Sequence, residues 1–253
     1  MTDARGPHGW AADTDAAAHT FADDLGDVVE VRGAEGHHLQ RVRRLRSGER
    51  VTVADGAGQW RAYEIESVDA GSLRLRAEGV IVVEPELVPR VSLALALTKA
   101  GALETVVARC TELGVARVTP VYAERCVVRW DEQHAARAVA RLRATARAAA
   151  EQSRRARLPD ITAPIDIAEL ALRRDVVVAE RGGAPSDAIT APAGADNEWT
   201  VLVGPEGGFA PGERARLGNM PHLGLGPHVL KAETAPIAAV AILIERAGRL
   251  CRE

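Results

Sequence analysis

Two glycine-containing segments near the end of the chain have residue types and spacing suited to binding a nucleotide-like cofactor. The first, Gly204-Pro205-Glu206-Gly207-Gly208, follows the apolar run 199–203. The second, residues 225–234, reads Leu-Gly-Pro-His-Val-Leu-Lys-Ala-Glu-Thr and leads into a helix for which Thr234 is the expected N-cap, with Pro236 in the first turn. Glycine permits backbone angles and close approaches that a Cβ forbids. Either segment alone could be an ordinary turn, but together they favour a cofactor held by the backbone.

The elements expected to position these segments form an α/β sheet. Apolar runs alternate with helical stretches, which is typical of mostly parallel strands. One helix is expected to end at Gly114, and a long Ala/Arg helix to extend from its cap Asp131 to about Ser153. Ligands of such sheets gather at the carboxyl ends of strands, and both glycine segments follow strands. The expected strands are residues 91–97, 116–122, 175–179 and 199–203.

The preceding part of the chain predicts a separate β-rich domain, residues 1–84. Short strands are expected at 51–53 and 62–65, with one helix in which Leu39, Val42 and Leu45 recur at three-residue spacing before Ser47-Gly48 stops it. Glu84 to Pro89 contains two prolines and predicts a linker. The second domain is therefore expected to cover residues 90–253.

Composition describes an ordinary globular protein with an uneven charge distribution. The formal net charge is −3, yet residues 125–157 contain nine arginines against three acids. The N-terminus lacks the basic start and apolar core of a signal peptide, and the apolar run 235–244 is shorter than the roughly 20 residues that span a bilayer. The three cysteines are widely spaced, without a C-x-x-C pair. We expect a cytoplasmic protein with no membrane association and no metal.

Other common cofactor and catalytic motifs are missing from the sequence. No G-x-G-x-x-G follows a strand with an acid downstream, and no G-x-x-x-x-G-K-[ST] occurs, which argues against the usual dinucleotide fold and a P-loop. H-E-x-x-H and G-x-S-x-G are absent as well.

In sequence and order, the two glycine segments resemble the SPOUT class of RNA methyltransferases, most closely the RsmE-type family, which methylates N3 of a uridine in 16S ribosomal RNA. Further matching pieces extend the resemblance over nearly the whole chain. They are His37 to Arg46, Glu112-Leu113-Gly114-Val115, Glu124-Arg125-Cys126 and Glu151-Gln152-Ser153-Arg154-Arg155.

The resemblance implies an α/β fold class with a small PUA-like, RNA-binding β-barrel at residues 1–84 and a SPOUT methyltransferase domain with a deep trefoil knot at 90–253. It also implies a homodimer, S-adenosylmethionine as cofactor, and 16S rRNA in the small ribosomal subunit as partner. The cofactor-binding residues implied are Leu202, Gly204, Pro205, Glu206, Gly207, Gly208, Leu223, Leu225, Gly226, Val229, Leu230 and Thr234.

Uridine N3 carries a proton at neutral pH, so its methylation needs a base, and a cation to stabilise the resulting anion. Lys231 is the candidate cation and Glu233 the candidate base or orienting group. Most family members have Leu-Arg-Thr-Glu-Thr where this chain has Leu230-Lys231-Ala232-Glu233-Thr234, so a forked guanidinium is replaced by a point charge. Candidate RNA-binding residues are Arg41, Arg43, Arg44, Arg125, Arg154, Arg155 and Arg157.

Two alternatives remain open from the sequence. One is a SPOUT enzyme acting at another RNA position, such as a ribose 2′-hydroxyl. The other is a non-catalytic RNA-binding factor for ribosome assembly, whose glycine segments are only turns. Binding of S-adenosylmethionine would argue against the second alternative, and nucleoside analysis of treated RNA would test the first.

Overall fold

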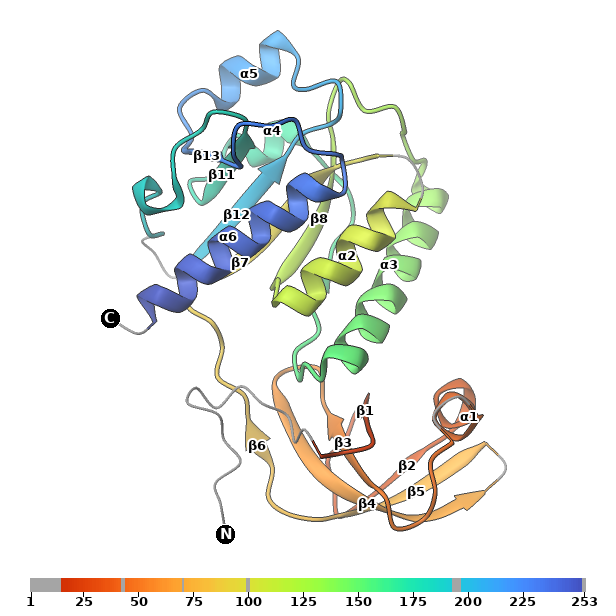
Figure 1. The fold of residues 1–253 in the computed structure, drawn as a ribbon. Coiled ribbons are helices and arrows are strands. Elements are labelled where there is room, and N and C mark those ends of the chain that lie inside the picture. The colour runs from red at the N-terminus through yellow and green to blue at the C-terminus, as the bar shows by residue number, and fades with distance from the viewer. Residues whose placement is uncertain (1–14, 42–43, 70, 99–100, 193–196, 252–253) are drawn as a thin grey trace. The chain divides into compact units, whose positions relative to one another are not determined.

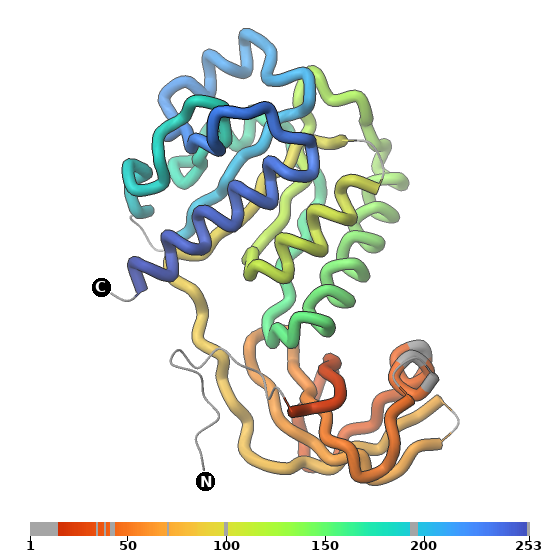
Figure 2. Tube along the Cα trace, viewed as in Figure 1, coloured from red at the N-terminus to blue at the C-terminus, as the bar shows by residue number. Residues whose placement is uncertain are grey.

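The computed structural model describes residues 15–41, 44–69, 71–98, 101–192 and 197–251. The chain divides into two compact units (Figures 1 and 2). Unit 1 comprises Met1–Glu86 together with Ala150–Leu158, and unit 2 comprises Leu87–Ala149 together with Pro159–Glu253.

Unit 1 is built on a curved sheet with the strand order β1-β3-β4-β5-β2, in which β6 also pairs with β4. Only the β1–β3 pair is parallel; the other pairs are antiparallel. Its core includes Tyr63, Ile65, Leu73 and Leu75, all with no exposed surface. The elements are β1 (Ala18–Phe21), β2 (Val28–Val31), α1 (Gly33–Arg41), β3 (Arg50–Ala54), β4 (Gln59–Asp69), β5 (Ser72–Ala77) and β6 (Val82–Val83).

The helix of unit 1 differs from the expected one. The predicted strands at 51–53 and 62–65 are confirmed within β3 and β4, whereas α1 ends at Arg41 and does not extend through Leu45. Arg44 has a φ of 55°, in the left-handed region, which is incompatible with a continuing right-handed helix. Leu45 is nevertheless buried in the core, so its apolar character reflects packing after the helix rather than a helical repeat.

Residues 150–158 belong to unit 1, although helix α3 up to Ala149 belongs to unit 2. Ala150 and Ala156 are buried against Phe21 and Ala54. Buried His19 lies with Nδ1 2.7 Å from Thr52 Oγ1 and Nε2 3.2 Å from the carbonyl oxygen of Arg155. Burial lowers the pKa of His19 to about 4. The sequence pattern alone predicted a unit that ends at the linker.

Unit 2 is a parallel α/β sheet with the strand order β10-β8-β7-β12-β11-β13, in which β9 also pairs with β8. All these pairs are parallel. Its elements are β7 (Arg90–Ala96), α2 (Ala102–Leu113), β8 (Arg117–Tyr122), α3 (Glu132–Ser153), β9 (Asp160–Ile161), β10 (Ile165–Asp166), α4 (Ile167–Leu170), β11 (Val176–Glu180), the 3-10 turn η1 (Ser186–Ala188), β12 (Glu198–Val203), α5 (Pro211–Leu217), β13 (His222–Gly224) and α6 (Thr234–Leu250).

Both faces of this sheet are covered by helices (Figure 1). One core contains residues of α2, α3 and α6, and the other contains residues of α4 and α5. Neighbouring residues of a strand point into different cores: Val201 and Val203 join the first, and Leu202 joins the second. Strands buried on both faces are rich in apolar residues on both sides, which makes them predictable from the sequence. All four predicted strands are confirmed, as β7, β8, β11 and β12. The long helix and its cap are also confirmed, because Asp131 Oδ1 accepts the His134 amide at 2.7 Å.

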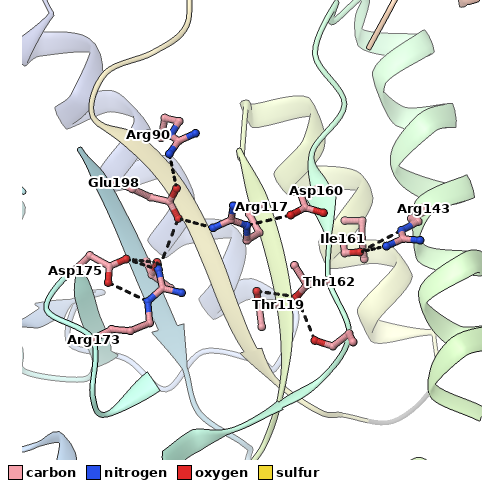
Figure 3. A network of polar contacts seen from close by, with 12 residues as sticks. Arg90, Arg117, Thr119, Arg143, Asp160, Ile161, Thr162, Arg173, Asp175 and Glu198 are labelled. Carbon is pink, nitrogen blue, oxygen red and sulfur yellow. Dashed lines mark hydrogen bonds and ion pairs between the residues drawn. The ribbon is translucent and has the colours of Figure 1, made fainter. Parts of the chain in front are cut away.

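A charged network joins the amino ends of the central strands (Figure 3). Glu198, at the start of β12, is 3% exposed and lies 3.3 Å from Arg90 and 3.4 Å from Arg117. Arg173 is 3.9 Å away and also pairs with Asp175. A buried carboxylate of this kind requires paired charges and hydrogen bonds, so the network holds the sheet at the edge opposite the carboxyl ends.

Candidate active site

A pocket of about 1170 Å³ lies at the carboxyl ends of β11 and β12 in unit 2. It is enclosed by the start of α2, the end of β11, the segment after β12 and the turn before α6. This is the edge at which parallel α/β sheets bind ligands. The lining residues are Gly101, Ala102, Ala179, Glu180, Arg181, Val203, Gly204, Pro205, Glu206, Gly208, Phe209, Arg214, Val229, Leu230, Lys231, Ala232, Glu233 and Ala235.

The segment after β12 turns sharply and has little space for larger residues. Gly208 has a φ of 68° and donates its amide to the carbonyl oxygen of Pro205 at 2.8 Å. A Cβ on Gly204 would lie 2.7 Å from the ring of Phe209. Glycine is therefore needed at 208 for its left-handed backbone angle, and at 204 because a side chain would clash with Phe209. At both positions the missing side chain leaves peptide groups accessible at the pocket wall.

The second segment enters α6 through a turn made by Lys231 to Glu233. The carbonyl oxygen of Lys231 accepts the amides of Thr234 at 3.0 Å and Ala235 at 3.1 Å. α6 begins at Thr234, and Glu233 occupies the capping position with helical angles, so the prediction of Thr234 as the N-cap is wrong. The turn places both predicted catalytic residues on the pocket lining, with Lys231 exposed and Glu233 half-buried.

Several other predicted cofactor-binding residues lie on the pocket wall as well. Leu202 and Leu223 are instead completely buried in the two cores. The remaining predicted residues are near the pocket in sequence but outside its lining: Gly207, Leu225, Gly226 and Thr234. Those on the wall are Gly204, Pro205, Glu206, Gly208, Val229 and Leu230.

Sequence reasoning missed the contributions of α2 and β11. Gly101 and Ala102 form one side of the pocket, and residues 179–181 form another. Residues 179–181 are the last residue of the predicted strand 175–179 and the two that follow it, so the carboxyl end of that strand was a usable signal. Glu180 joins two neighbouring groups, because Oε1 accepts a hydrogen bond from Arg214 at 3.2 Å and Oε2 lies 2.8 Å from His222 Nδ1.

Glu213 connects the start of α5 to the loop after β8. It is 6% exposed, and its carboxylate accepts the amide of Ala210 at 2.8 Å and that of Glu124 at 2.8 Å. Arg125, next in the chain, donates to the carbonyl oxygen of Gly207 at 2.9 Å. The predicted RNA-binding Arg125 is thus fixed beside the first glycine segment, residues 204–208.

The other predicted RNA-binding arginines belong to unit 1. Arg44 is exposed after α1, whereas Arg43 and the side chain of Arg41 lie outside the described residues. Arg154 donates to the carbonyl oxygen of Ala16, and Arg157 donates to those of Ala57 and Glu84. Burial lowers the pKa of Arg155 to about 10, and Glu84 partly opposes that shift. Arg154 and Arg157 therefore have structural contacts besides any part in binding RNA.

Two further classes of feature are absent from the described residues. No helix there combines the length and apolar character needed to cross a membrane. In the same ranges, no cluster of three or more histidine, cysteine or acidic side chains has an arrangement that could hold a metal ion.

Comparison with known proteins gives a consistent result along the chain. Residues 85–244 match the RNA methyltransferase domain, and residues 31–78 match the RNA methyltransferase PUA domain. Ribosomal RNA small subunit methyltransferase E of Mycobacterium bovis is 34% identical over 235 residues, covering 88% of this chain and 89% of that protein. The protein of the same name from Bacillus subtilis is 28% identical, covering 85% and 89%.

Solved structures agree with these matches. Ribosomal RNA small subunit methyltransferase E of Neisseria gonorrhoeae, bound to S-adenosyl methionine, superimposes with a TM-score of 0.77 at 25% identity, covering 88% of this chain and 95% of that one. A Legionella pneumophila protein in complex with the same cofactor gives a TM-score of 0.79 at 25% identity, covering 90% and 97%. With the family match over residues 85–244 and a relative 34% identical along most of both chains, this protein belongs to the RNA methyltransferase family.

Proposed function

We propose that this chain uses S-adenosylmethionine to methylate N3 of a uridine in 16S ribosomal RNA of the small subunit. The observation that supports this most directly is the pocket at the carboxyl ends of β11 and β12, lined by both glycine-containing segments. Relatives named for methylation of small-subunit ribosomal RNA, and a similar structure bound to S-adenosyl methionine, support the choice of cofactor and substrate.

The lining of the pocket suits this cofactor. Its volume of about 1170 Å³ accommodates a nucleoside with an attached amino acid. Small residues such as Gly204 and Gly208 expose peptide groups for hydrogen bonds, while Val203 and Leu230 offer apolar surface for the base. When bound, S-adenosylmethionine supplies an electrophilic methyl group on its sulfonium. The pocket residues have to align that methyl group with the incoming nitrogen, because the displacement is in-line.

Lys231 and Glu233 supply the remaining requirements for attack by uridine N3. Glu233 receives the proton from N3, or orients the group that does. Lys231 places its ammonium beside the anion that forms, whose charge is shared with the two flanking carbonyl oxygens. The turn into α6 carries both side chains to the same wall of the pocket, which is the geometric support for assigning them to one reaction.

We infer three further properties from the family resemblance. The chain around residues 204–208 and 223–230 forms a deep trefoil knot, the protein acts as a homodimer in the cytoplasm, and residues 1–84 grip RNA. The backbones of two segments approach closely in the same region: Ala184 donates to His222 O at 2.7 Å and Gly224 to Ala184 O at 2.8 Å. A Cβ on Gly183 would lie 2.6 Å from the backbone of Leu223, so these segments need close approach.

The test combines calorimetric titration with S-adenosylmethionine and a methyl-transfer assay on small subunits that lack the modification. We expect binding, and 3-methyluridine in the nucleoside mass spectrum. A 2′-O-methylated nucleoside would move the target to ribose, and absence of binding would favour a non-catalytic assembly factor. Ala232→Trp, on the pocket lining, should abolish cofactor binding, whereas Ala215→Trp, exposed on α5, should not. Equal affinities in these two variants would overturn the placement of the cofactor.

A further inference from the structure

Helix α3 has an unusual distribution of charge. Between Glu132 in its first turn and Glu151 near its end, the helix contains four arginines and no acid. The arginines are Arg137, Arg141, Arg143 and Arg147, and all precede residue 150, so they belong to unit 2. A surface helix that only needs to be soluble usually mixes acids with bases at i,i+4 spacing. In α3 only Arg147 has an acid at that spacing, Glu151, whereas Arg137, Arg141 and Arg143 have none.

The four arginines form two rows on the helix. One row consists of Arg137 and Arg141, and the other of Arg143 and Arg147. At 3.6 residues per turn, the two rows are separated by about 120° around the helix axis. From Arg137 to Arg147 the helix rises about 15 Å. We call these two pairs the arginine rows.

The surface between the arginine rows is made of small side chains. Ala140 and Ala144 lie between the rows by their angular position, and both are exposed. Ala136 and Ala148 continue the same line along the helix and are exposed too. Because no large side chain projects between the rows, a partner can approach the helix backbone closely, with a row of arginines on either side of it.

The hydrogen bonds of Arg143 and Arg137 position these two side chains with little loss of charge. Arg143 donates two N–H groups to the carbonyl oxygen of Ile161, at 3.1 and 2.8 Å, and Arg137 donates to the main-chain and side-chain oxygens of Gln133. These acceptors carry no net charge. Arg141 is paired with Glu104 at 2.6 Å, yet its side chain is still 53% exposed. Guanidiniums fixed by neutral acceptors keep their attraction for phosphate and lose less rotamer entropy on binding.

We propose that this face of α3 binds the sugar–phosphate backbone of double-helical RNA, with the alanines against the wide, shallow minor groove and one arginine row directed at each phosphate strand. A shallow groove edged by two rows of phosphates complements a low surface edged by two rows of guanidiniums. The inference rests on the proposed function, because it names the structural class of RNA that the enzyme holds beside its pocket. It adds a surface that the predicted RNA-binding arginines do not include.

The test measures binding to an RNA duplex of about 16 base pairs across a salt series, by fluorescence anisotropy. Arg137→Gln/Arg141→Gln and Arg143→Gln/Arg147→Gln each remove one row and keep good helix formers. Each should weaken duplex binding and reduce the slope of log affinity against log salt by about one for every phosphate that the variant no longer neutralises. Arg174→Gln/Arg216→Gln removes the same charge from exposed positions elsewhere in unit 2 and should change neither quantity by as much.

Ala144→Trp tests the close approach without changing charge. It should weaken duplex binding by about tenfold or more, while Ala215→Trp should leave it unchanged. Equal effects of the row variants and their charge-matched control, or duplex binding unaffected by Ala144→Trp, would overturn the proposal. Competition by polyglutamate as effective as that by duplex RNA would also overturn it, because charge alone would then explain the binding.

Titration with S-adenosylmethionine separates this inference from the proposed function. The row variants should keep the wild-type affinity for the cofactor, since none of the four arginines lines the pocket. A wild-type protein that binds neither cofactor nor RNA would refute the proposed function itself. Normal methyl transfer together with unchanged duplex binding in the variants would refute only the role of α3.

Discussion

Replacement of Glu213 should loosen two segments that are far apart in sequence. Its buried carboxylate accepts one amide from Ala210, at the start of α5, and one from Glu124, in the loop after β8, both at 2.8 Å. A hydrogen bond to a charged group contributes about 1.5–3 kcal/mol. Glu213→Gln keeps one acceptor oxygen and should cost about one such bond, whereas Glu213→Ala should cost about two.

The effect can be measured by hydrogen exchange at the two amides that the Glu213 carboxylate accepts. In Glu213→Ala, we expect the amides of Glu124 and Ala210 to exchange about tenfold to a hundredfold faster, because each 1.4 kcal/mol corresponds to a factor of ten. The dissociation constant for S-adenosylmethionine should rise by about tenfold, since binding must then order residues 204–210. Calorimetric titration of the two variants would measure this change.

Glu169 provides a matched control for Glu213. It occupies the same third position of a helix, α4, and its carboxylate accepts the amide of Asp166 at 3.1 Å, but it is exposed and does not line the pocket. Glu169→Ala should therefore loosen only its own helix start. Faster exchange at Ala210 with unchanged exchange at Glu124 would show that Glu213 is only a helix cap, and would refute the coupling.

Three further predictions concern catalysis, sheet stability and pH. Lys231→Ala should lower kcat about a hundredfold with little change in cofactor affinity, because its charge is needed only as the anion forms, and Lys231→Arg should restore most of the rate. Glu198→Gln should destabilise unit 2 by about 1–3 kcal/mol, seen as a lower Tm, because the buried carboxylate loses its charge-assisted contacts with the half-buried Arg90 and Arg117, while cofactor affinity measured in the cold persists. Unit 1 should lose up to about 3 kcal/mol as the pH falls from about 6.5 to 4, because folding holds His19 neutral and depresses its pKa to about 4. His19→Gln should remove that pH dependence.

These predictions have distinct contrary outcomes. An unchanged kcat in Lys231→Ala would exclude the lysine as the stabilising charge. A Tm for Glu198→Gln equal to that of the wild type would mean that the network in Figure 3 contributes no net stability. Hydrogen exchange in unit 1 that stays constant between pH 6.5 and 4, after correction for the intrinsic rate, would show that His19 is not held neutral by the fold.

The sequence predicted much of unit 2 because local pattern and tertiary role agree there. A parallel strand such as β12 is buried on both faces, so four of the five residues from Trp199 to Val203 are apolar, with Thr200 the exception. Asp131 and Gly114 have the local chemistry of helix ends, and the structure uses them as such. The two glycine segments also lie where predicted, because each follows a strand and precedes a helix.

The features that the sequence did not reveal depend on interactions between distant segments. Glu213 could be identified as a capping residue from its spacing to Ala210, but its bond to the Glu124 amide spans 89 positions. Leu45 completes a helical repeat in sequence, yet it is buried after the chain has left the helix at Arg44. Leu202 and Leu223 adjoin the glycine segments but are used for core packing.

The return of residues 150–158 to unit 1 affects the order in which the protein can fold during synthesis. His19, Phe21 and Ala54 can pack against this segment only after residues 87–149 have been translated. The N-terminal unit therefore remains incomplete while residues 87–149 of the other unit leave the ribosome. Its final packing and the growth of α3 are linked events, since both depend on the same stretch of nascent chain.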